Sequence, residues 1–252
     1  MLRTRVIPCL LLKGNGLVKT VQFKNPTYIG DPINAVKIFN DKEVDELVFL
    51  DITATQEKRG PNFKILSEIA TECFMPVGYG GGISNLSEIE QLFNLGIEKV
   101  ILNSCAFSQP DLLTQAINIF GSQSIVVSMD VKKHWITRKQ AVYTMNGKQN
   151  TNFSPRDYAK KMEDVGVGEI ILNSIDLDGT MSGYDYELIK AVSSEVKIPI
   201  VALGGAGSLE DLGKAKSAGA SAVSAGSLFV FQKAHRAVLI TYPNKKEIEL
   251  FI

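Results

Sequence analysis

Eight short apolar runs, separated by amphipathic stretches with helical spacing, constrain the fold of this 252-residue chain more than any other feature. Runs such as VFLD, VILN and PIVAL show little alternation with polar residues, which is typical of strands buried on both faces of a parallel sheet. Parallel strands are joined by crossover connections, usually helices. The pattern therefore predicts an α/β fold, a single-domain (β/α)8 or TIM barrel over residues 1–252, with an open doubly wound sheet as the alternative.

The expected elements follow from these runs and from the spacing between them. Strands are expected at 5–11, 46–51, 76–79, 99–103, 124–130, 169–173, 198–203 and 220–224. Helices are expected at 32–40, 62–73, 86–95, 111–120, 155–165, 186–195 and 209–218, with a weaker pattern at 230–239. Two inserts, 13–30 and 132–154, follow the first and fifth strands, and the second is expected to turn on Asn146-Gly147.

Internal repetition favours the closed barrel over the open sheet. GYGGGIS at 78–84 matches ALGGAGS at 202–208, an offset of 124, and LDIT at 50–53 matches NSID at 173–176, an offset of 123. Ser104 and Ser227 are also 123 residues apart. A near-constant offset predicts two duplicated half-barrels, at about 1–122 and 123–243.

Glycines at corresponding strand ends predict two phosphate sites. A single Gly-Gly is ordinarily a tight turn, but paired occurrence favours loops whose backbone N–H groups approach an anion. The residues that would form the two pockets are Gly81, Gly82, Asn103 and Ser104 in the first half, and Asp178, Gly179, Gly204, Gly205, Gly226 and Ser227 in the second. The prediction is a phosphorylated small-molecule substrate that carries a phosphate at each end.

Composition excludes several classes of partner. With 27 basic and 27 acidic residues, the chain lacks the positive charge that nucleic acids or anionic membranes attract. Cys9, Cys73 and Cys105 lie far apart in apolar surroundings, which favours reduced thiols and a cytoplasmic location. The only histidines are His134 and His235 and no P-loop motif is present, so we expect no metal and no cofactor.

Several strings together resemble the cyclase subunit of imidazole glycerol phosphate synthase, a lyase of histidine biosynthesis. They are DELVFLDITA, EKR at 57–59, GGGI, FGSQ, GYD at 183–185 and GGAG, spread over nearly the whole chain. The resemblance implies a heterodimer with a glutaminase subunit of a glutamine amidotransferase complex. Ammonia from that partner would cross the barrel and react with a bis-phosphorylated nucleotide.

The resemblance also implies roles for single residues. Asp130 matches one of the family's two catalytic aspartates, whereas Leu11 stands at the position of the other. Leucine cannot transfer a proton, and losing one partner of an acid/base pair costs about 10²–10⁴ in rate. Asn173 and Leu203 replace a threonine and a serine of the family's mouth, and Lys19 matches a lysine of its substrate loop or is an exposed loop lysine.

Charged residues at four strand starts match the family's ammonia gate at the opposite end of the barrel. They are Arg5, Glu46, Lys99 and Glu169. Taken singly, each is a solvated strand-start charge, because such residues are mostly exposed. All four together predict a ring that neutralises itself and leaves a path for a small neutral molecule.

Three interpretations of function follow. The first is a synthase subunit that has diverged towards sugar amidation, where such relatives resemble ammonia donors to a separate downstream amidotransferase. The second is a non-catalytic scaffold that activates a glutaminase and passes ammonia onward. The third, an unrelated phosphosugar isomerase, is disfavoured by the continuous resemblance.

A few other residues carry open alternatives. Asp51 and Asp176 would contact substrate at the mouth or hold loops. Cys9 is expected to be a packed core thiol. His134 and Trp135 in the second insert are expected to pack within that loop, with substrate stacking as the alternative.

Overall fold

The chain folds into a closed barrel of eight parallel strands, as predicted. The computed structural model describes residues 4–232 and 237–252. Neighbouring strands pair in parallel around the full circle, and pairing of β10 with β7 completes it. In order round the barrel the strands are β1 (Arg5–Lys13), β4 (Leu47–Asp51), β5 (Val77–Gly80), β6 (Lys99–Leu102), β7 (Ile125–Lys133), β10 (Glu169–Ser174), β11 (Ile200–Leu203) and β12 (Ala222–Ala225).

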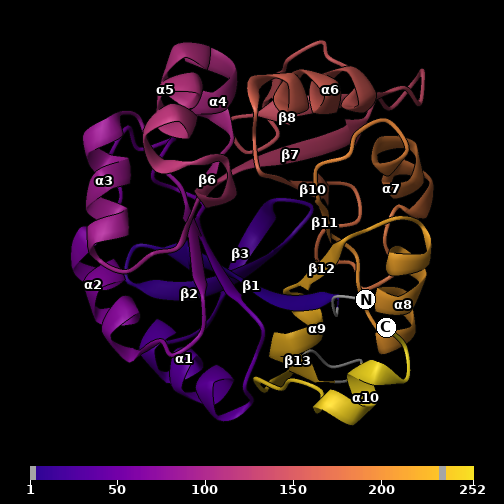
Figure 1. Cartoon of the computed structure of the whole chain (residues 1–252). Coiled ribbons are helices and arrows are strands. Elements are labelled where there is room, and N and C mark those ends of the chain that lie inside the picture. The colour runs from indigo at the N-terminus through magenta and orange to yellow at the C-terminus, as the bar shows by residue number, and fades with distance from the viewer. Residues whose placement is uncertain (1–3, 233–236) are drawn as a thin grey trace.

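Helices surround the strands, as Figure 1 shows. The seven longer ones are α1 (Pro32–Asp41), α2 (Phe63–Glu72), α3 (Leu86–Asn94), α5 (Pro110–Phe120), α6 (Pro155–Val165), α7 (Tyr186–Ser193) and α8 (Leu209–Ser217). Shorter ones are α4 (Ser104–Ser108), the 3-10 turn η1 (Ser122–Ser124), α9 (Ser227–Val230) and α10 (Lys245–Glu249). Within the described ranges, none of the helices has both the length and the apolar character needed to span a bilayer.

Helix ends lie where the sequence places capping residues. Asp31 precedes Pro32 at the start of α1, and Ser154 precedes Pro155 at the start of α6. Each capping oxygen accepts a backbone N–H of the first turn, and proline suits the position that needs no donor. α6 ends at Gly166, whose φ of 95° is in the left-handed region that favours glycine.

Both inserts form antiparallel hairpins on the barrel. The first consists of β2 (Gly16–Val21), which pairs with β1, and β3 (Lys24–Gly30). The second consists of β8 (Gln140–Thr144), which pairs with the extended end of β7, and β9 (Gln149–Asn150). The β8–β9 turn contains Asn146 and Gly147, with φ values of 56° and 72°. The predicted turn on these two residues is therefore confirmed.

Two apolar clusters stabilise the fold. The larger lies between strands and helices and includes Phe39, Phe49 and Leu66, all fully buried. The smaller fills the barrel interior and includes Ile7, Val126 and the other inward-facing residues of the strands. Because burying one large apolar side chain contributes roughly 1.5–3 kcal/mol, the strands are anchored on both faces.

All eight expected strands and seven of the expected helices are present, with ends displaced by a few residues. The helix expected at 230–239 is wrong. α9 ends at Val230, and β13 (Phe231–Gln232) then pairs antiparallel with β14 (Ala237–Val238). Aromatic and β-branched residues favour this extended pairing. Residues 233–236, with His235, lie outside the described residues.

Candidate functional site at the barrel mouth

A cavity of about 590 Å³ lies at the carboxyl ends of the barrel strands. Strands β1, β4, β6, β7, β10 and β11 each contribute a wall residue, in the last four positions of the strand or directly after it. These residues are Leu11, Leu50, Asn103, Asp130, Asn173 and Leu203. This end of a barrel of this type carries the active site, and the volume suits a small-molecule ligand.

Asp130 lies between two asparagine side chains. Asn103 Nδ2 donates to its Oδ2 at 3.2 Å, and Asn173 Nδ2 donates to its Oδ1 at 3.1 Å. The three residues come from neighbouring strands, so the barrel itself sets their spacing. The carboxyl group is thus held in one orientation with one donor on each oxygen.

Burial raises the pKa of Asp130 to about 7. The charge of nearby Asp178 raises the pKa further, while the hydrogen bond from Asn173 opposes the shift. A carboxyl group with a pKa near neutrality can both hold and release a proton under physiological conditions. Asp130 therefore has the properties of a general acid or base.

Three leucines form an apolar part of the cavity wall, beside polar lining residues such as Lys19 and Asp51. Leu11, Leu50 and Leu203 belong to the interior cluster or pack against it, and Leu11 is only 7% exposed. β1 lies four strands from β7 in both directions round the barrel, so Leu11 occupies the strand opposite that of Asp130. The mouth therefore has a carboxyl group that can exchange a proton on β7 and an apolar side chain on the strand opposite to it.

The first predicted phosphate pocket lies at one side of this cavity. Gly81 and Gly82 have φ values of 126° and 75°, and a Cβ on either would lie 2.5 Å from a backbone oxygen. Only glycine fits these two positions, as the turn prediction required. Asn103 and Ser104 line the same part of the cavity, and Ser104 begins α4. All four residues of this predicted set line the cavity.

The glycines predicted for the second pocket have the same left-handed backbone conformations. Gly204 and Gly205 have φ values of 90° and 113°, and Ser227 begins α9. Of this predicted set, only Asp178 lines the cavity. Ser227 Oγ is buried and has no hydrogen-bond partner among the described residues. It remains available as a donor to a ligand.

Lys19 lines the cavity and lies beside Gly226, a residue predicted for the second pocket. Its Nζ is 3.4 Å from Asp178 Oδ1, and a Cβ on Gly226 would lie 2.9 Å from the same Nζ. The side chain is 6% exposed, which excludes the exposed loop lysine that was the alternative. The β2–β3 hairpin thus places a cation beside Gly226.

The turn at Asp178-Gly179 packs directly under the first hairpin. Gln22 N donates to Asp178 O at 2.8 Å, and Thr20 Oγ1 donates to Asp178 Oδ2 at 3.3 Å. A Cβ on Gly179 would lie 2.2 Å from Thr20 O. The hairpin therefore covers this turn.

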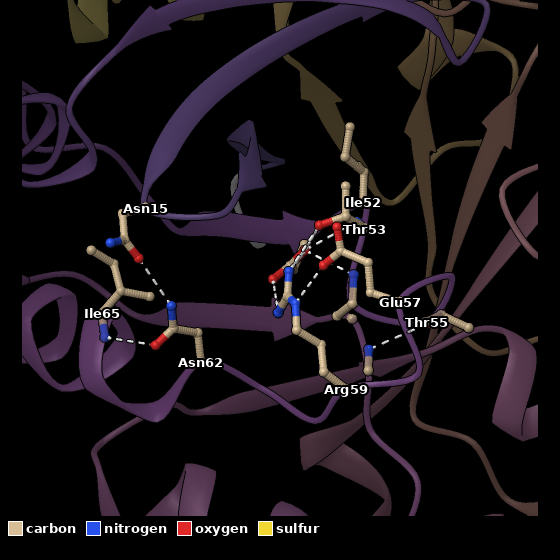
Figure 2. A network of polar contacts seen from close by, with 12 residues as sticks. Asn15, Ile52, Thr53, Thr55, Glu57, Arg59, Asn62 and Ile65 are labelled. Carbon is tan, nitrogen blue, oxygen red and sulfur yellow. Dashed lines mark hydrogen bonds and ion pairs between the residues drawn. The ribbon is translucent and has the colours of Figure 1, made fainter.

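Asp51 organises the loop between β4 and α2. Its carboxylate accepts from Arg59 Nη1 at 2.8 Å and Nη2 at 3.0 Å, and from the backbone N–H groups of Thr53 and Ala54. Figure 2 shows the Arg59 side chain directed towards Thr53 and Glu57. Asp51 thus holds its loop, and it also lines the cavity, so both alternatives for this residue stay open. Arg59 was missed as a positioning residue, although it lies in the EKR string.

Asp176 also holds a loop. Its Oδ2 accepts the backbone N–H of Lys133 at 2.8 Å, which joins the loop after β10 to the second insert. The residue does not line the cavity. The loop-holding alternative is therefore supported for Asp176.

The inner turn of the second insert reaches across the mouth, which the sequence did not reveal. Met145 N donates to Ser104 Oγ at 3.1 Å, and Asn146 Nδ2 donates to Ile52 O at 2.5 Å. Both residues line the cavity. In the sequence, the only indication of this contact was that the insert follows the carboxyl end of a strand.

A closed ring of charges lies at the other end of the barrel. Arg5 pairs with Glu46 and Glu169, and Lys99 Nζ lies 2.9 Å from Glu46 and 2.8 Å from Glu169. All four residues stand at or next to the starts of strands β1, β4, β6 and β10. Cation and carboxylate alternate around the ring, so each charge has two partners.

The barrel interior between ring and mouth is apolar. Its inward-facing residues include Ile7, Val48, Val126, Ile171 and Val201. Cys9 belongs to the same cluster, and burial raises the pKa of its thiol to about 12. The expectation of a packed core thiol is confirmed.

Neither of the two expectations for Trp135 holds. The side chain is 79% exposed and does not line the cavity, so it neither packs within its loop nor stacks on a ligand there. The turn that follows β7 directs it away from the protein. Within residues 4–232 and 237–252, no group of three metal-ligating side chains comes together.

Comparisons with known proteins find relatives over nearly the whole chain. The model of a family described as "Histidine biosynthesis protein" matches residues 5–235. A Pseudomonas aeruginosa protein named "Putative imidazole glycerol phosphate synthase subunit hisF2" is 50% identical over 99% of this chain and 100% of its own length. A Leptospira interrogans protein named "Putative imidazole glycerol phosphate synthase subunit HisF" is 48% identical over 99% of this chain and 98% of its own length. A Dictyoglomus thermophilum protein named "Imidazole glycerol phosphate synthase subunit HisF" is 42% identical over 92% of this chain and 91% of its own length.

Proposed function

The chain belongs to the histidine biosynthesis protein family, and from this premise we propose that it is the ammonia-accepting barrel subunit of a glutamine amidotransferase complex. Its partner would be a glutaminase that docks at the charged end of the barrel. The substrate would be a phosphorylated small molecule held at the mouth.

The observation that carries this proposal is the order of features along the barrel axis. A self-neutralising ring of Arg5, Glu46, Lys99 and Glu169 closes one end, an apolar interior follows, and Asp130 stands at the other end. Neutral ammonia loses little on entering apolar surroundings compared with an ion, for which desolvation is costly. The order suits delivery of ammonia and exclusion of ions.

We assign the proton transfer at the mouth to Asp130. Its pKa of about 7 lets it accept a proton from an attacking amine or donate one to a leaving group. Asn103 and Asn173 are positioning residues, because each donates to one carboxyl oxygen and fixes its direction.

Phosphate groups would bind in the two glycine pockets. Backbone N–H groups near Gly81 and Gly82 and the hydroxyl of Ser104 serve the first. Lys19 and the unpaired hydroxyl of Ser227 serve the second. Ser104 is hydrogen-bonded to Met145, and Lys19 forms an ion pair with Asp178. When phosphate binds, contacts with the phosphate would have to replace these two contacts.

The acceptor proposed for this chain differs from that of the cyclase. Leu11 leaves Asp130 without a second acid on the opposite strand, and Leu203 extends the apolar wall. A substrate that needs one proton transfer beside an apolar group fits such a mouth better than one that needs an acid/base pair. We therefore propose a diverged role in sugar amidation, with a separate amidotransferase downstream.

A second candidate is supported by the same wall. If the chain consumes no ammonia, it acts as a conduit and activator of the glutaminase, and the phosphate pockets bind effectors. Replacing Leu11 by aspartate separates the two: cyclase activity gained in L11D indicates a nearly intact enzyme site, whereas none indicates a conduit.

The test combines the purified chain with its cognate glutaminase. We expect a complex whose glutamine hydrolysis exceeds that of the glutaminase alone, and no normal turnover of the histidine-pathway nucleotide with ammonium salt. Lys99→Ala should lower the stimulation, whereas Lys37→Ala, which removes an exposed ion pair, should not. Absence of any complex or stimulation would contradict the proposal, and cyclase turnover at normal rates would remove its sugar-amidation part.

A further inference from the structure

Residues 132–139, here called the basic finger, form the outer turn of the second insert. They join β7 to β8 beyond the carboxyl end of the barrel strand, and residues 134–139 are all exposed. The finger lies on the same end of the barrel as the cavity, opposite to the ring of charges. It therefore belongs to the surface that a protein acting at the mouth would meet.

The finger is an ordered turn rather than a loose loop. His134 N donates to Lys139 O at 2.8 Å, and Arg138 N donates to His134 O at 2.9 Å. His134 Nδ1 in turn accepts from the backbone N–H groups of Ile136 and Thr137, at 3.3 and 3.2 Å. A turn held in this way loses little conformational entropy when a partner binds.

This ordered turn displays two large apolar side chains. Trp135 is 79% exposed and Ile136 is 63% exposed, and Trp135 is the only tryptophan of the chain. Neither contributes to the two apolar clusters or to the cavity. Tryptophan and arginine are the residues most enriched at the energetic centres of protein interfaces. The finger offers Trp135 as an anchor with Arg138 beside it.

The finger is also positively charged, although the chain as a whole has no net charge. Lys132, Lys133, Arg138 and Lys139 lie in the sequence KKHWITRK, which contains no acidic residue. Lys133 pairs with Asp185 at 2.9 Å, and Lys132 Nζ lies 5.7 Å from the centre of the Tyr143 ring. Among the described residues, no carboxylate pairs with Arg138 or Lys139. Their charges remain available to an acidic surface.

Strand β8 connects the basic finger to the cavity. The finger stands at one end of β8 (Gln140–Thr144), and Met145, which contacts Ser104, follows the other end. Five residues of strand span about 17 Å. A protein seated on the finger would thus lie next to the mouth and could sense Met145 through a single rigid strand.

From these observations we propose that the basic finger docks the enzyme that consumes the ammonia, through an acidic surface around an apolar pocket that receives Trp135. The identity of that enzyme rests on the proposed function above. The docked protein would cover the mouth, so that ammonia leaving the barrel enters its active site rather than solvent.

A protein fits the finger better than a membrane or a nucleic acid does. Two apolar side chains on one tight turn form a small anchor suited to a single pocket, whereas stable membrane attachment needs a larger apolar face or a second signal. The zero net charge of the chain opposes broad binding to polyanions. We therefore expect that the chain does not bind anionic vesicles.

The first experiment places a photo-crosslinking amino acid at position 135 in the full chain expressed in its native host. The control carries the same amino acid at position 119, where Ile119 is 61% exposed on α5, away from the finger. We expect one protein crosslinked at 135 and absent at 119. If no protein is specific to position 135, the proposal is wrong.

The second experiment purifies the captured protein and titrates it against the wild-type chain. Trp135 is the only tryptophan of the chain, so a tryptophan-free variant of the captured protein leaves it as the only tryptophan of the complex. A shift of the tryptophan emission to shorter wavelength then reports the burial of Trp135 directly. We expect Trp135→Ala to weaken binding roughly 30-fold, as for an interface hot spot. Arg138→Glu should weaken it in low salt more than in high salt, because added salt screens charge attraction. Ile119→Ala should bind as the wild type does.

Three outcomes would overturn the proposal. One is equal binding by wild type and Trp135→Ala, both shown to be folded by thermal unfolding. Another is a blue shift with vesicles of phosphatidylglycerol and phosphatidylcholine, which would identify a membrane surface instead. The third is a captured protein that binds through the finger but has no ammonia-dependent activity. Stimulation of the glutaminase by Trp135→Ala is measured alongside, so that failure of the docking proposal is distinguished from failure of the proposed function.

Discussion

Leu11 and Asp130 lie on opposite strands of the barrel, β1 and β7, and face the same cavity. Asp130 is held by two asparagines, whereas Leu11 packs with Cys9, Val18 and the rest of the interior cluster. Leu11 is therefore held by apolar packing, whereas the carboxyl group of Asp130 is held by polar neighbours.

Replacing Leu11 by aspartate should destabilise the protein in a pH-dependent way. Burial among apolar residues would raise the pKa of the new carboxyl group above its value in the unfolded chain. The variant's stability is then highest at acid pH and falls as pH rises from about 4 towards the raised pKa. We expect Leu11→Asp to cost about 2 kcal/mol more at about pH 8 than at about pH 4, measured by urea unfolding.

Leu11→Asn is the matched control for that measurement. It introduces a polar side chain of similar size without a titratable group, so its cost should not change over this pH range. Equal pH dependence of the two variants would show that the apolar wall does not perturb a carboxylate at position 11.

Replacing Asp130 by asparagine should change stability in the opposite sense. Burial in the folded protein raises the pKa of Asp130 to about 7 from its ordinary value of about 4, so its protonated form favours folding. This contribution is full below about pH 4 and is lost as pH rises to about 7. Between about pH 5 and about pH 8, the free energy of unfolding of Asp130→Asn should gain about 3 kcal/mol relative to wild type.

Urea unfolding at both pH values measures this gain. Asp41→Asn, a change of an exposed aspartate at the end of α1, serves as the control and should show no such trend. A constant difference between Asp130→Asn and wild type would mean that Asp130 remains ionised throughout.

The barrel and much of the site followed from sequence because their signals are local and repeated. Apolar runs fix buried parallel strands, and glycines such as Gly81 and Gly204 mark turns that only glycine can adopt. The ring could be expected because four charges stand at strand starts, and strand starts share one end of a barrel.

Contacts between the inserts could not be predicted in the same way. The closure of β2 on Gly179 and the reach of Met145 to Ser104 depend on how hairpins bend over the mouth, which no local pattern specifies. The burial of Lys19 and the outward direction of Trp135 follow from these same bends. The wrong helix at 230–239 has a related cause, because its pairing partner is a strand beyond the segment itself.

Replacing Gly179 by alanine should open the first hairpin. The residue has a φ of 73°, and its Cβ would lie 2.2 Å from Thr20 O, so β2 must move. We expect faster tryptic cleavage at exposed Lys24 and weaker protection of that site by inorganic phosphate.

Gly14→Ala provides the control for the hairpin prediction. Gly14 has a φ of 61°, yet nothing lies within 4 Å of its Cβ position, so the variant carries similar backbone strain without a clash. Cleavage at Lys24 should then remain near the wild-type rate. Similar acceleration in both variants would trace the effect to strain instead of to contact with Thr20.

Replacing Lys99 by alanine should destabilise the protein more than removal of an exposed cation. Glu46 and Glu169, whose side chains are 5% and 8% exposed, would share Arg5 as their one remaining cation of the ring. Removing one partner of buried charges costs about 3 kcal/mol, whereas the exposed pair of Lys37 and Glu72 is worth less than about 1 kcal/mol. Urea unfolding of Lys99→Ala and Lys37→Ala measures the two losses.

A second substitution shows whether the loss in Lys99→Ala arises from unpaired carboxylates. Glu169→Gln keeps the shape of the side chain but removes its charge, so adding it to Lys99→Ala should recover part of the lost stability. In the wild-type background the same change should destabilise, because it leaves Lys99 and Arg5 with one carboxylate between them. If Glu169→Gln destabilises both backgrounds equally, the four charges do not act as a coupled ring.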